Sequence, residues 1–302
     1  MPSPTFDVAA FAAALGADAD AFQLNVLAEC DSTNTQLMRL AEAAAPSGMV
    51  VVAERQSKGR GRRERVWISS PLHSLTFSLL WRFAAESAAP EALSLAVGLG
   101  LQRALAAAGV TAAVKWPNDI LCRDRKLAGV LIEVQPGDIK SAIIGIGINL
   151  RLPPDMPAAI AGNAIALDEV LPQPPTRERL LAVLLSELAA TLHRYQSEGF
   201  AGLRDEWQAR HAFQGSNVRI TGGGEDIEGI CSGVTERGEL LIDTAQGIKR
   251  VITGDVSLRL LPETHIASVV AHVGSPPQPT SPREGGDNIS PPDGRETKRG
   301  AG

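Results

Sequence analysis

The apolar residues of the first 150 positions follow two periods, one typical of helices and one typical of strands. Apolar positions three or four apart predict a helix that begins after Asp31-Ser32-Thr33-Asn34 and a second helix over residues 91–108. Short apolar runs elsewhere predict strands at residues 49–53, 75–83 and 110–115. This alternation predicts a mixed α/β domain rather than a helical bundle or a β-sandwich.

Two further apolar runs, residues 127–134 and 139–150, flank Pro136-Gly137-Asp138 and predict an antiparallel hairpin. Side chains alternate between the two faces of a strand, so three isoleucines of the second run share one face. The opposite face carries Gly145, Gly147 and Asn149. Two glycines on one face leave bare backbone, which permits close approach of a flat ligand or another chain, or gives room for a packed helix.

The chain after residue 150 contains three segments with different residue patterns before its C-terminal tail. Residues 151–175 hold six prolines and predict an irregular connection. Apolar stripes predict helices over residues 176–195 and from about Phe200 to Trp207, and short strands between residues 217 and 260 predict a small barrel. We therefore expect a larger domain over residues 1–213, a β-barrel over 214–262 and a disordered, proline-rich tail over 263–302.

The composition predicts a protein that folds without disulfides in a reducing compartment. The 302 residues are 44% hydrophobic, and the net charge of -5 argues against general affinity for nucleic acids or anionic membranes. Cys30, Cys122 and Cys231 lie far apart and form no zinc-binding pattern. No signal peptide and no apolar run of the roughly 18 residues that a membrane span needs can be found, so a cytoplasmic protein is expected.

Residues 55–65 form the most unusual local feature, with six basic residues and one acidic residue on a chain of net negative charge. Gly59 and Gly61 let the backbone approach a ligand closely, and arginine side chains bind phosphate or carboxylate in a bidentate way. The segment predicts a loop that binds an anion. From this segment alone, a solvated basic loop or an RNA contact is the alternative.

A second polar motif, Lys115-Trp116-Pro117-Asn118-Asp119, follows a predicted strand. Its amine, amide and carboxylate could together hold a phosphate, a ribose or a magnesium ion. The alternative is a polar turn in which the amide and the carboxylate make only local hydrogen bonds. Lys126 enters the next apolar strand, where a lysine is usually a surface residue, but it would lie beside the target of the basic loop.

Five motifs, in this order, resemble the motif set of the biotin protein ligases. They are Ser32-Thr33-Asn34; Gln56 with Gly59-Arg60-Gly61-Arg62-Arg63 and Trp67; Lys115 to Asp119; Lys126-Leu127-Ala128-Gly129; and Gly145-Ile146-Gly147-Ile148-Asn149. The resemblance covers about residues 24–261 and includes residues 254–259, which are similar to the end of the family's small barrel. Five ordered motifs are far more specific than one, and they favour a ligase loop over an RNA contact.

The resemblance implies an α/β (α+β) fold, with a central mixed sheet and flanking helices like the class II aminoacyl-tRNA synthetases, followed by an SH3-like β-barrel. It implies a ligase that uses ATP to convert biotin to biotinyl-5'-AMP and then transfers biotin to a lysine of a biotin carboxyl carrier protein domain. Biotin, ATP and Mg2+ are the expected small molecules. A ligase for a related acyl cofactor such as lipoate is one alternative, and a non-catalytic nucleic-acid-binding protein is another.

The resemblance also implies roles for individual residues. The expected catalytic residues are Arg60, Arg62, Lys115 and Lys126, with Lys126 at the biotin carboxylate or the acyl-phosphate linkage and Lys115 at the attacked phosphate. Ser32, Thr33 and Gln56 are expected to hydrogen-bond the ureido ring, and Gly145 and Gly147 to form the bare wall of the biotin slot. Asn118 and Asp119 are expected at the nucleotide, with Asp119 at the Mg2+ ion and Trp67 near the adenine. The remaining expected binding residues are Asn34, Gly59, Gly61, Arg65, Gly129 and Asn149.

Two departures from the family pattern affect these expectations. Glu64 stands where the family loop usually has glycine, and it could temper the charge of the loop or alter its closed form. Retention of the intermediate is affected more than its formation. About 24 residues precede the Cys30 region, too few for an N-terminal helix-turn-helix domain, so a ligase without a DNA-binding domain is expected. Neither the acceptor nor the oligomeric state follows from the sequence, although a homodimer through a sheet edge is possible.

Overall fold

A computed structural model describes residues 6–84, 91–135, 138–222, 224–252 and 256–261. Residues 1–263 cluster as one compact unit, which contains both sheets of the protein. The boundary near residue 214 stays a prediction, and the tail expected over residues 263–302 lies outside the described residues. No helix in the described ranges has both the length and the apolar character that crossing a membrane requires.

Seven α-helices and two 3-10 turns are described. The helices are α1 (Val8–Leu15), α2 (Thr33–Glu42), α3 (Leu93–Ala107), α4 (Ala158–Ala161), α5 (Leu167–Val170), α6 (Arg177–Glu198) and α7 (Ala201–Ala209). The 3-10 turns are η1 (Gly16–Ala21) and η2 (Arg62–Glu64). The predicted helices correspond to α2, α3, α6 and α7, and the proline-rich connection is irregular apart from the single turns α4 and α5.

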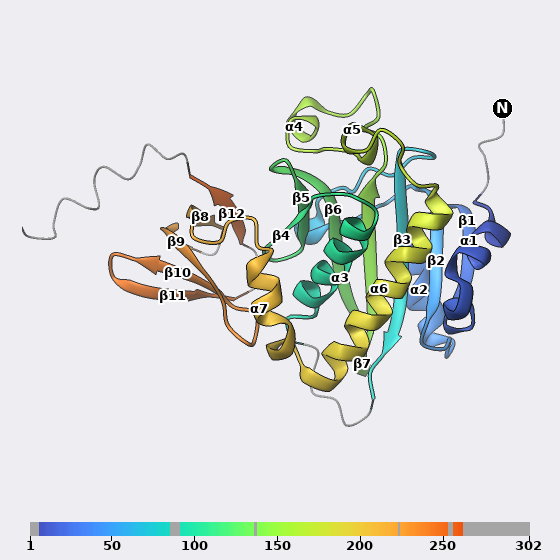
Figure 1. Ribbon diagram of the computed structural model, residues 1–302, viewed down its shortest axis with the longest axis horizontal. Coiled ribbons are helices and arrows are strands. Elements are labelled where there is room, and N and C mark those ends of the chain that lie inside the picture. Colours follow the sequence, from blue (N-terminus) through green and yellow to red (C-terminus); the bar gives the residue numbers. More distant parts are fainter. Residues whose placement is uncertain (1–5, 85–90, 136–137, 223, 253–255, 262–302) are drawn as a thin grey trace, which may run out of the picture. The chain divides into compact units, whose positions relative to one another are not determined.

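Seven strands form a mixed sheet in the order β1-β2-β3-β7-β6-β5-β4, in which β1 and β2 are parallel and the other pairs are antiparallel. Their bounds are β1 (Gln23–Cys30), β2 (Met49–Gln56), β3 (Ser74–Arg82), β4 (Ala113–Lys115), β5 (Asp119–Cys122), β6 (Arg125–Gln135) and β7 (Asp138–Asn149). The predicted mixed sheet and the predicted hairpin, β6 with β7, are therefore confirmed (Figure 1).

Five short strands form a second, antiparallel sheet in the order β11-β10-β9-β8-β12. Their bounds are β8 (Asn217–Thr221), β9 (Ile227–Val234), β10 (Leu240–Thr244), β11 (Gly247–Val251) and β12 (Ser257–Leu260). The first four strands follow one another as a meander, and β12 returns to pair with β8. This is the small β-structure that the glycine-punctuated sequence predicts.

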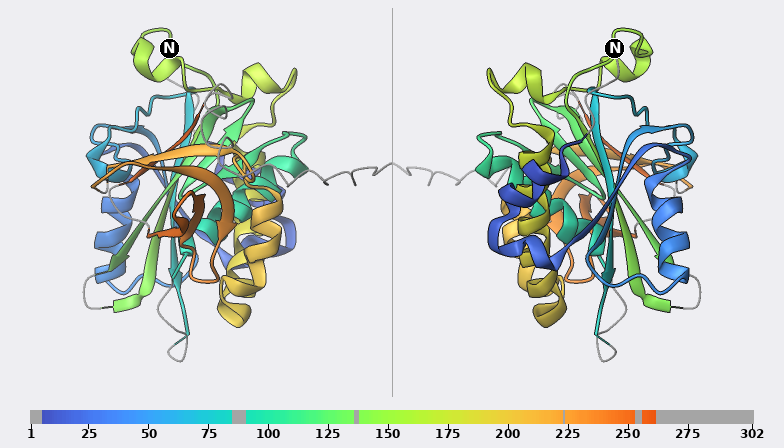
Figure 2. Two further views of the ribbon diagram at one scale, coloured as in Figure 1. Left: turned by 90° about the vertical axis from the view of Figure 1, so that its left-hand side faces the viewer. Right: turned by 90° about the vertical axis from the view of Figure 1, so that its right-hand side faces the viewer.

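The two faces of the large sheet bury different helices (Figure 2). Helices α1, α3 and α6 cover one face, where Ile144, Ile146 and Ile148 belong to the main apolar core. Helix α2 packs on the other face against a smaller cluster that includes Leu37 and Ile143. Because residues alternate along β7, the glycines at 145 and 147 lie on the α2 face, beyond the area that this helix covers. The functional site is built there.

Candidate functional site

A cavity of about 500 Å3 opens on the α2 face of the large sheet, over the glycines of β7. This is the size of a pocket for a small organic ligand. Most of the predicted site residues line it: Ser32, Thr33, Asn34, Gln56, Arg60, Gly61, Arg62, Arg65, Trp67, Lys115, Asn118, Asp119, Lys126, Gly129, Gly145 and Gly147. Five separate stretches of the chain thus meet at one place, as the motif set predicts.

Helix α2 presents the residues at its N-terminus to the cavity. Ser32 is the N-cap of α2 but makes no capping hydrogen bond with its side chain. The Asp31 carboxylate accepts from the backbone N–H of Ser32 and from Gln36 Nε2, each at 2.8 Å, and these bonds lower the pKa of Asp31 although its partial desolvation opposes them. The Ser32 hydroxyl is therefore available to a ligand.

A chain of buried hydrogen bonds orients the polar side chains next to α2. Gln56 Oε1 accepts from the backbone N–H and the hydroxyl of Thr33, at 2.7 and 3.1 Å. Ser78, on β3, donates to Asn34 Oδ1 at 2.5 Å and lies 2.7 Å from the Thr33 hydroxyl. Because Oε1 of Gln56 is already engaged, the group that this side chain can offer to a ligand is its amide N–H.

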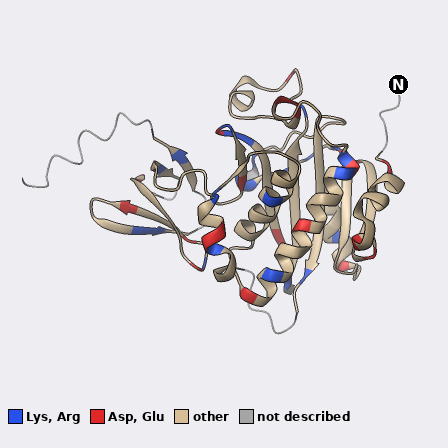
Figure 3. Ribbon diagram, viewed as in Figure 1, with Lys and Arg blue, Asp and Glu red and all other residues tan. Residues whose placement is uncertain are grey.

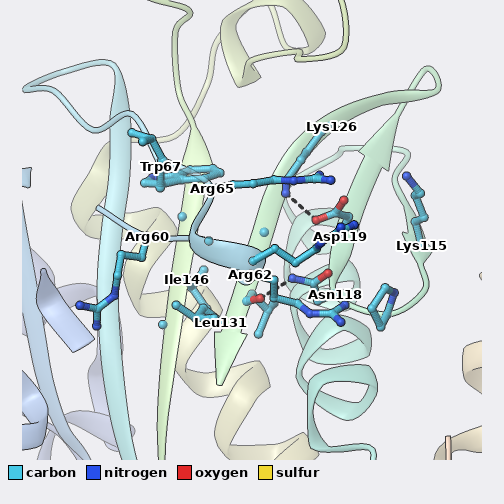
Figure 4. Close-up of a pocket in the computed structure, with 18 of the residues that line it drawn as sticks. Arg60, Arg62, Arg65, Trp67, Lys115, Asn118, Asp119, Lys126, Leu131 and Ile146 are labelled. Atoms are coloured by element: carbon cyan, nitrogen blue, oxygen red, sulfur yellow. Dashed lines mark hydrogen bonds and ion pairs between the residues drawn. The ribbon is translucent and has the colours of Figure 1, made fainter. Parts of the chain in front are cut away.

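Glu133, on β6, extends this network. Its Oε2 accepts from Asn34 Nδ2 at 2.7 Å and its Oε1 accepts from Arg60 Nη2 at 3.3 Å. Arg60 also donates to the Thr35 hydroxyl at 3.2 Å, so its guanidinium turns away from the other cations of the cavity (Figure 4). Sequence analysis did not identify Glu133 or Ser78, because neither lies in a motif and both act through side chains from other strands.

The bare backbone of β7 is in close contact with two side chains. A Cβ added at Gly145 would overlap the Asn34 amide, and a Cβ added at Gly147 would overlap the Trp67 indole. The Trp67 ring also lies 5.9 Å from Lys126 Nζ, and its Nε1 is buried without a hydrogen-bond partner. The glycines are thus required for close approach, which the sequence predicts, and in this structure the indole is one of the groups that approach.

Basic side chains dominate the rest of the cavity. Lys126 Nζ lies 2.5 Å from Asp119 Oδ1, and Arg65 extends toward the same pair (Figure 4). Burial lowers the pKa of Lys115; the Asp119 carboxylate opposes this effect, and the charges of Arg259, Lys126 and Arg65 add to it. Elsewhere acidic and basic residues are mixed, as along α6 and α7 (Figure 3). A group of cations with one carboxylate is suited to binding more than one anionic group.

The turn between β4 and β5 carries the second predicted motif. Lys115 ends β4 and Asp119 begins β5, and the two residues are paired across the strands. Asn118 Nδ2 donates to the Val130 carbonyl at 2.7 Å, while Val130 N–H donates to the Asn118 carbonyl at 2.9 Å. The Asn118 amide and the Asp119 carboxylate therefore bond to residues of β6 and not only locally, so the polar-turn alternative does not describe this motif. The turn places both charged side chains at the cavity.

Two predicted binding residues do not line the cavity, and each has a structural contact instead. Gly59 accepts from the Trp67 N–H at 2.9 Å, and a Cβ at position 59 would overlap the Trp67 carbonyl. Asn149 Nδ2 donates to the carbonyls of Lys126 and Ile165, at 3.2 and 3.1 Å. Gly59 lets the basic loop close on itself, and Asn149 fixes the backbone that carries Lys126.

Several lining residues were not predicted. Thr76 and Leu131 come from neighbouring strands, Ile160 comes from α4, and Ser257 and Arg259 come from β12 of the small sheet. Arg259 falls in the stretch that resembles the end of the family's barrel, but nothing in the sequence shows that β12 reaches the cavity. The Glu64 backbone belongs to η2, within the basic loop.

The residues present do not form a site that would hold a metal ion on its own. Asp119 is the one carboxylate among the described residues that line the cavity, and it is paired with Lys126. The described residues also contain no cluster of three or more metal-ligating side chains. A hard cation usually needs several oxygen ligands, so any Mg2+ here would be bound mainly by the phosphates of a nucleotide.

Comparisons with known proteins give a consistent picture. Residues 26–149 match the Biotin/lipoate A/B protein ligase family, and residues 213–259 match the Biotin protein ligase C terminal domain. The chain is 36% identical over 244 residues to the Bifunctional ligase/repressor BirA of Escherichia coli (strain K12), covering 80% of this chain and 75% of that protein. It is 33% identical to the Biotin--[acetyl-CoA-carboxylase] ligase of Mycobacterium tuberculosis, covering 80% and 91%.

Among solved structures, the fold is similar to a biotin protein ligase from Aquifex aeolicus in complex with biotin and ATP. The TM-score is 0.70 and the sequence identity is 32%, with 79% of this chain and 99% of that chain covered. The resemblance thus extends over most of this chain and nearly all of the solved one.

Proposed function

This chain belongs to the biotin protein ligases of the biotin/lipoate A/B protein ligase family, and from this membership and the cavity we propose how it acts. It activates biotin with ATP as biotinyl-5'-AMP and transfers the biotinyl group to a lysine of a biotin carboxyl carrier protein domain. The observation that carries this proposal is the meeting, in one cavity, of an uncharged polar network, a bare strand and a set of cations. Each of these features corresponds to one part of the two substrates.

The polar network favours biotin over lipoate. Biotin carries a ureido ring with N–H donors and a carbonyl acceptor, whereas the dithiolane ring of lipoate has neither. Ser32 and Gln56 line the cavity, and we assign the Ser32 hydroxyl and the Gln56 amide N–H to the ureido group. A ligand without polar ring atoms would leave these groups buried and unpaired, which commonly costs about 1–3 kcal/mol per group.

The cations serve the first reaction. A carboxylate oxygen of biotin attacks the α-phosphorus of ATP; a P–O bond forms, the bond to the bridging oxygen breaks, and pyrophosphate leaves. Both reactants are anions, so we assign Lys126 to the biotin carboxylate and Lys115, with Arg62 and Arg65, to the charge that builds on the phosphate. Removing one such donor costs on the order of 10² to 10³ in rate.

The second reaction uses the same site. The amine of the acceptor lysine attacks the acyl carbon of the mixed anhydride, the C–O bond to AMP breaks, and the nitrogen loses a proton as the amide forms. The anhydride hydrolyses readily in water, so a loop that covers it serves to keep water out. We assign this role to the basic loop, residues 55–65, which contributes Arg60, Arg62 and Arg65 to the cavity.

Magnesium enters this scheme as part of the ATP substrate. Asn118 and Asp119 are proposed at the nucleotide, with Asp119 facing the phosphate-bound ion.

A cytoplasmic location is proposed from the three free and buried cysteines. We propose that the edge strand β1 supports a homodimer, which sedimentation would test.

Isotope exchange tests the proposal directly. Purified protein is incubated with labelled pyrophosphate, MgATP and either biotin or lipoate. We expect label to enter ATP with biotin and not with lipoate; exchange with lipoate alone would overturn the choice of substrate. Mass spectrometry of an apo carrier domain after incubation with biotin and MgATP then tests transfer, with an acceptor Lys→Arg variant as the control.

A further inference from the structure

The turn that carries Lys115 is hydrogen-bonded to the segment that joins α7 to the small sheet. Trp116 N–H donates to His211 Nε2 at 3.3 Å, and Trp116 Nε1 donates to the Gly238 carbonyl at 3.0 Å. Backbone bonds continue the contact, because Val114 N–H donates to the Arg210 carbonyl at 3.0 Å. The turn is therefore held on both sides by parts of the chain more than 90 residues away.

His211 is well suited to hold this turn. Its side chain is buried, and its ring stacks on Trp207 at 4.6 Å with an interplanar angle of 22°. Because Nε2 accepts a backbone N–H, the ring proton is on Nδ1, which lies 3.7 Å from Cys231 Sγ. Burial, together with the nearby charge of Lys115, lowers the pKa of His211 to about 3, so the ring stays a neutral acceptor.

The same segment supports the lysine itself. The Phe213 ring lies 5.6 Å below Lys115 Nζ, a distance at which an aromatic face attracts a cation. His211 and Phe213 also contact each other, with ring centroids 6.2 Å apart. Neither residue lines the cavity, so neither is expected to touch a substrate.

We propose that His211 is a positioning residue for biotin activation, which acts through the Trp116 N–H and together with Phe213 holds the Lys115 ammonium at the attacked phosphate. The proposal rests on the function proposed above. The residues proposed to bind biotin lie at the start of α2 and in β2, β6 and β7, so the loss of His211 should lower the rate of activation and leave biotin affinity unchanged.

Two substitutions at position 211 separate positioning from packing. His211→Phe keeps an aromatic ring against Trp207 but removes the acceptor, whereas His211→Gln loses the ring but can place an acceptor oxygen near the former Nε2 position. The measurements are kcat for pyrophosphate release with saturating biotin and MgATP, biotin affinity by calorimetry, and the thermal midpoint. His193→Phe is the matched control, because this ring packs on Trp81 at 5.0 Å and does not line the cavity.

We expect His211→Phe to lower kcat about 10- to 100-fold, since small displacements of a catalytic group have effects of this size. Biotin affinity should stay within about threefold of the wild-type value, and His193→Phe should have wild-type kcat. His211→Gln should recover part of kcat although its thermal midpoint is the lower of the two. If His211 had a purely structural role, the variant with the lower thermal midpoint would also have the lower kcat. That result would overturn the proposal.

Phe213→Leu gives a second test if His211→Phe does not fold. Removing the ring below Lys115 should lower kcat about tenfold with unchanged biotin affinity, because leucine offers no attraction to the ammonium. A folded Phe213→Leu protein with wild-type kcat would overturn the proposal. Failure of the wild-type protein to activate biotin would refute the proposed function instead, so the two failures are distinguishable.

Discussion

The Trp67 indole packs directly on the backbone of Gly147, in the space that a side chain at position 147 would occupy. This contact joins the segment just after the basic loop to the middle of β7, and the same ring lies 5.9 Å from Lys126 Nζ. The position of Trp67 and the shape of the proposed biotin slot therefore depend on the same glycine.

We predict that Gly147→Val obstructs the proposed biotin slot and displaces the Trp67 indole from its position on β7. The rigid indole and the backbone of a central strand cannot both move aside, so biotin affinity should fall at least about 100-fold, with a loss of stability of about 1–3 kcal/mol. Calorimetry and chemical denaturation would measure these effects. Gly162→Ala is the control, because the nearest atom to its added Cβ is at an ordinary 3.5 Å. Unaltered biotin binding by Gly147→Val would contradict the close approach of a ligand to this strand.

We predict that Lys126→Ala weakens biotin binding about 10- to 100-fold, because the carboxylate loses a charged hydrogen-bond donor. Its ion pair with Asp119 is only partly buried, so the free energy of unfolding should change by no more than about 1 kcal/mol. Arg125→Ala is the control, since that neighbouring side chain bonds to Glu169 and not to the cavity. Wild-type biotin affinity in Lys126→Ala would contradict a role of Lys126 in binding the biotin carboxylate.

Glu133→Gln should weaken biotin binding about three- to tenfold without a direct contact to the ligand. The carboxylate accepts from Asn34 and Arg60 at once, and the neutral amide holds the arginine less strongly. Binding measured at several salt concentrations should show a smaller effect at high salt, where the charge interaction is already screened. An effect independent of salt would indicate that only the shape of Glu133 matters.

The stability of the protein should depend on pH through His211. Its pKa falls from 6.5 to about 3 on folding, so the unfolded state binds the proton more readily. The contribution of neutral His211 is complete above about pH 6.5 and is lost as the pH falls from there toward 3, at up to about 1.4 kcal/mol per pH unit. Urea unfolding of the wild type and His211→Phe between pH 4 and 7 would measure the difference. If the free energy of unfolding changed equally with pH in the two proteins, His211 would not titrate in this way.

The sequence predicts the fold well where the pattern of residues within one element determines its structure. The alternation of glycine and isoleucine along β7 predicts which face is bare, and the structure places Gly145 and Gly147 on the α2 face accordingly. Strand β1 was not predicted, because it is a sheet-edge strand with mixed burial and lacks a clear apolar alternation. Helix α1 was also not predicted, since its alanines give little contrast between faces.

The candidate site was predicted where residues lie in motifs and missed where they act across strands. Lys115 and Lys126 belong to ordered motifs, and both line the cavity. Glu133, Ser78 and His211 were missed because their partners are 44 to 99 residues away in the sequence. Hydrogen bonds between such distant residues depend on strand order and register, which no local pattern encodes.

The hydrogen bond from the Trp116 indole to the Gly238 carbonyl limits which C-terminal sheets could replace the one in this protein. A chimera that receives the C-terminal sheet of another ligase would present a different carbonyl, or none, to the indole. Grafts of residues 217–260 should therefore be chosen for the backbone path of the β9–β10 turn before sequence similarity is considered. Through the Gly238 carbonyl, the small sheet is part of the support for the turn that carries Lys115.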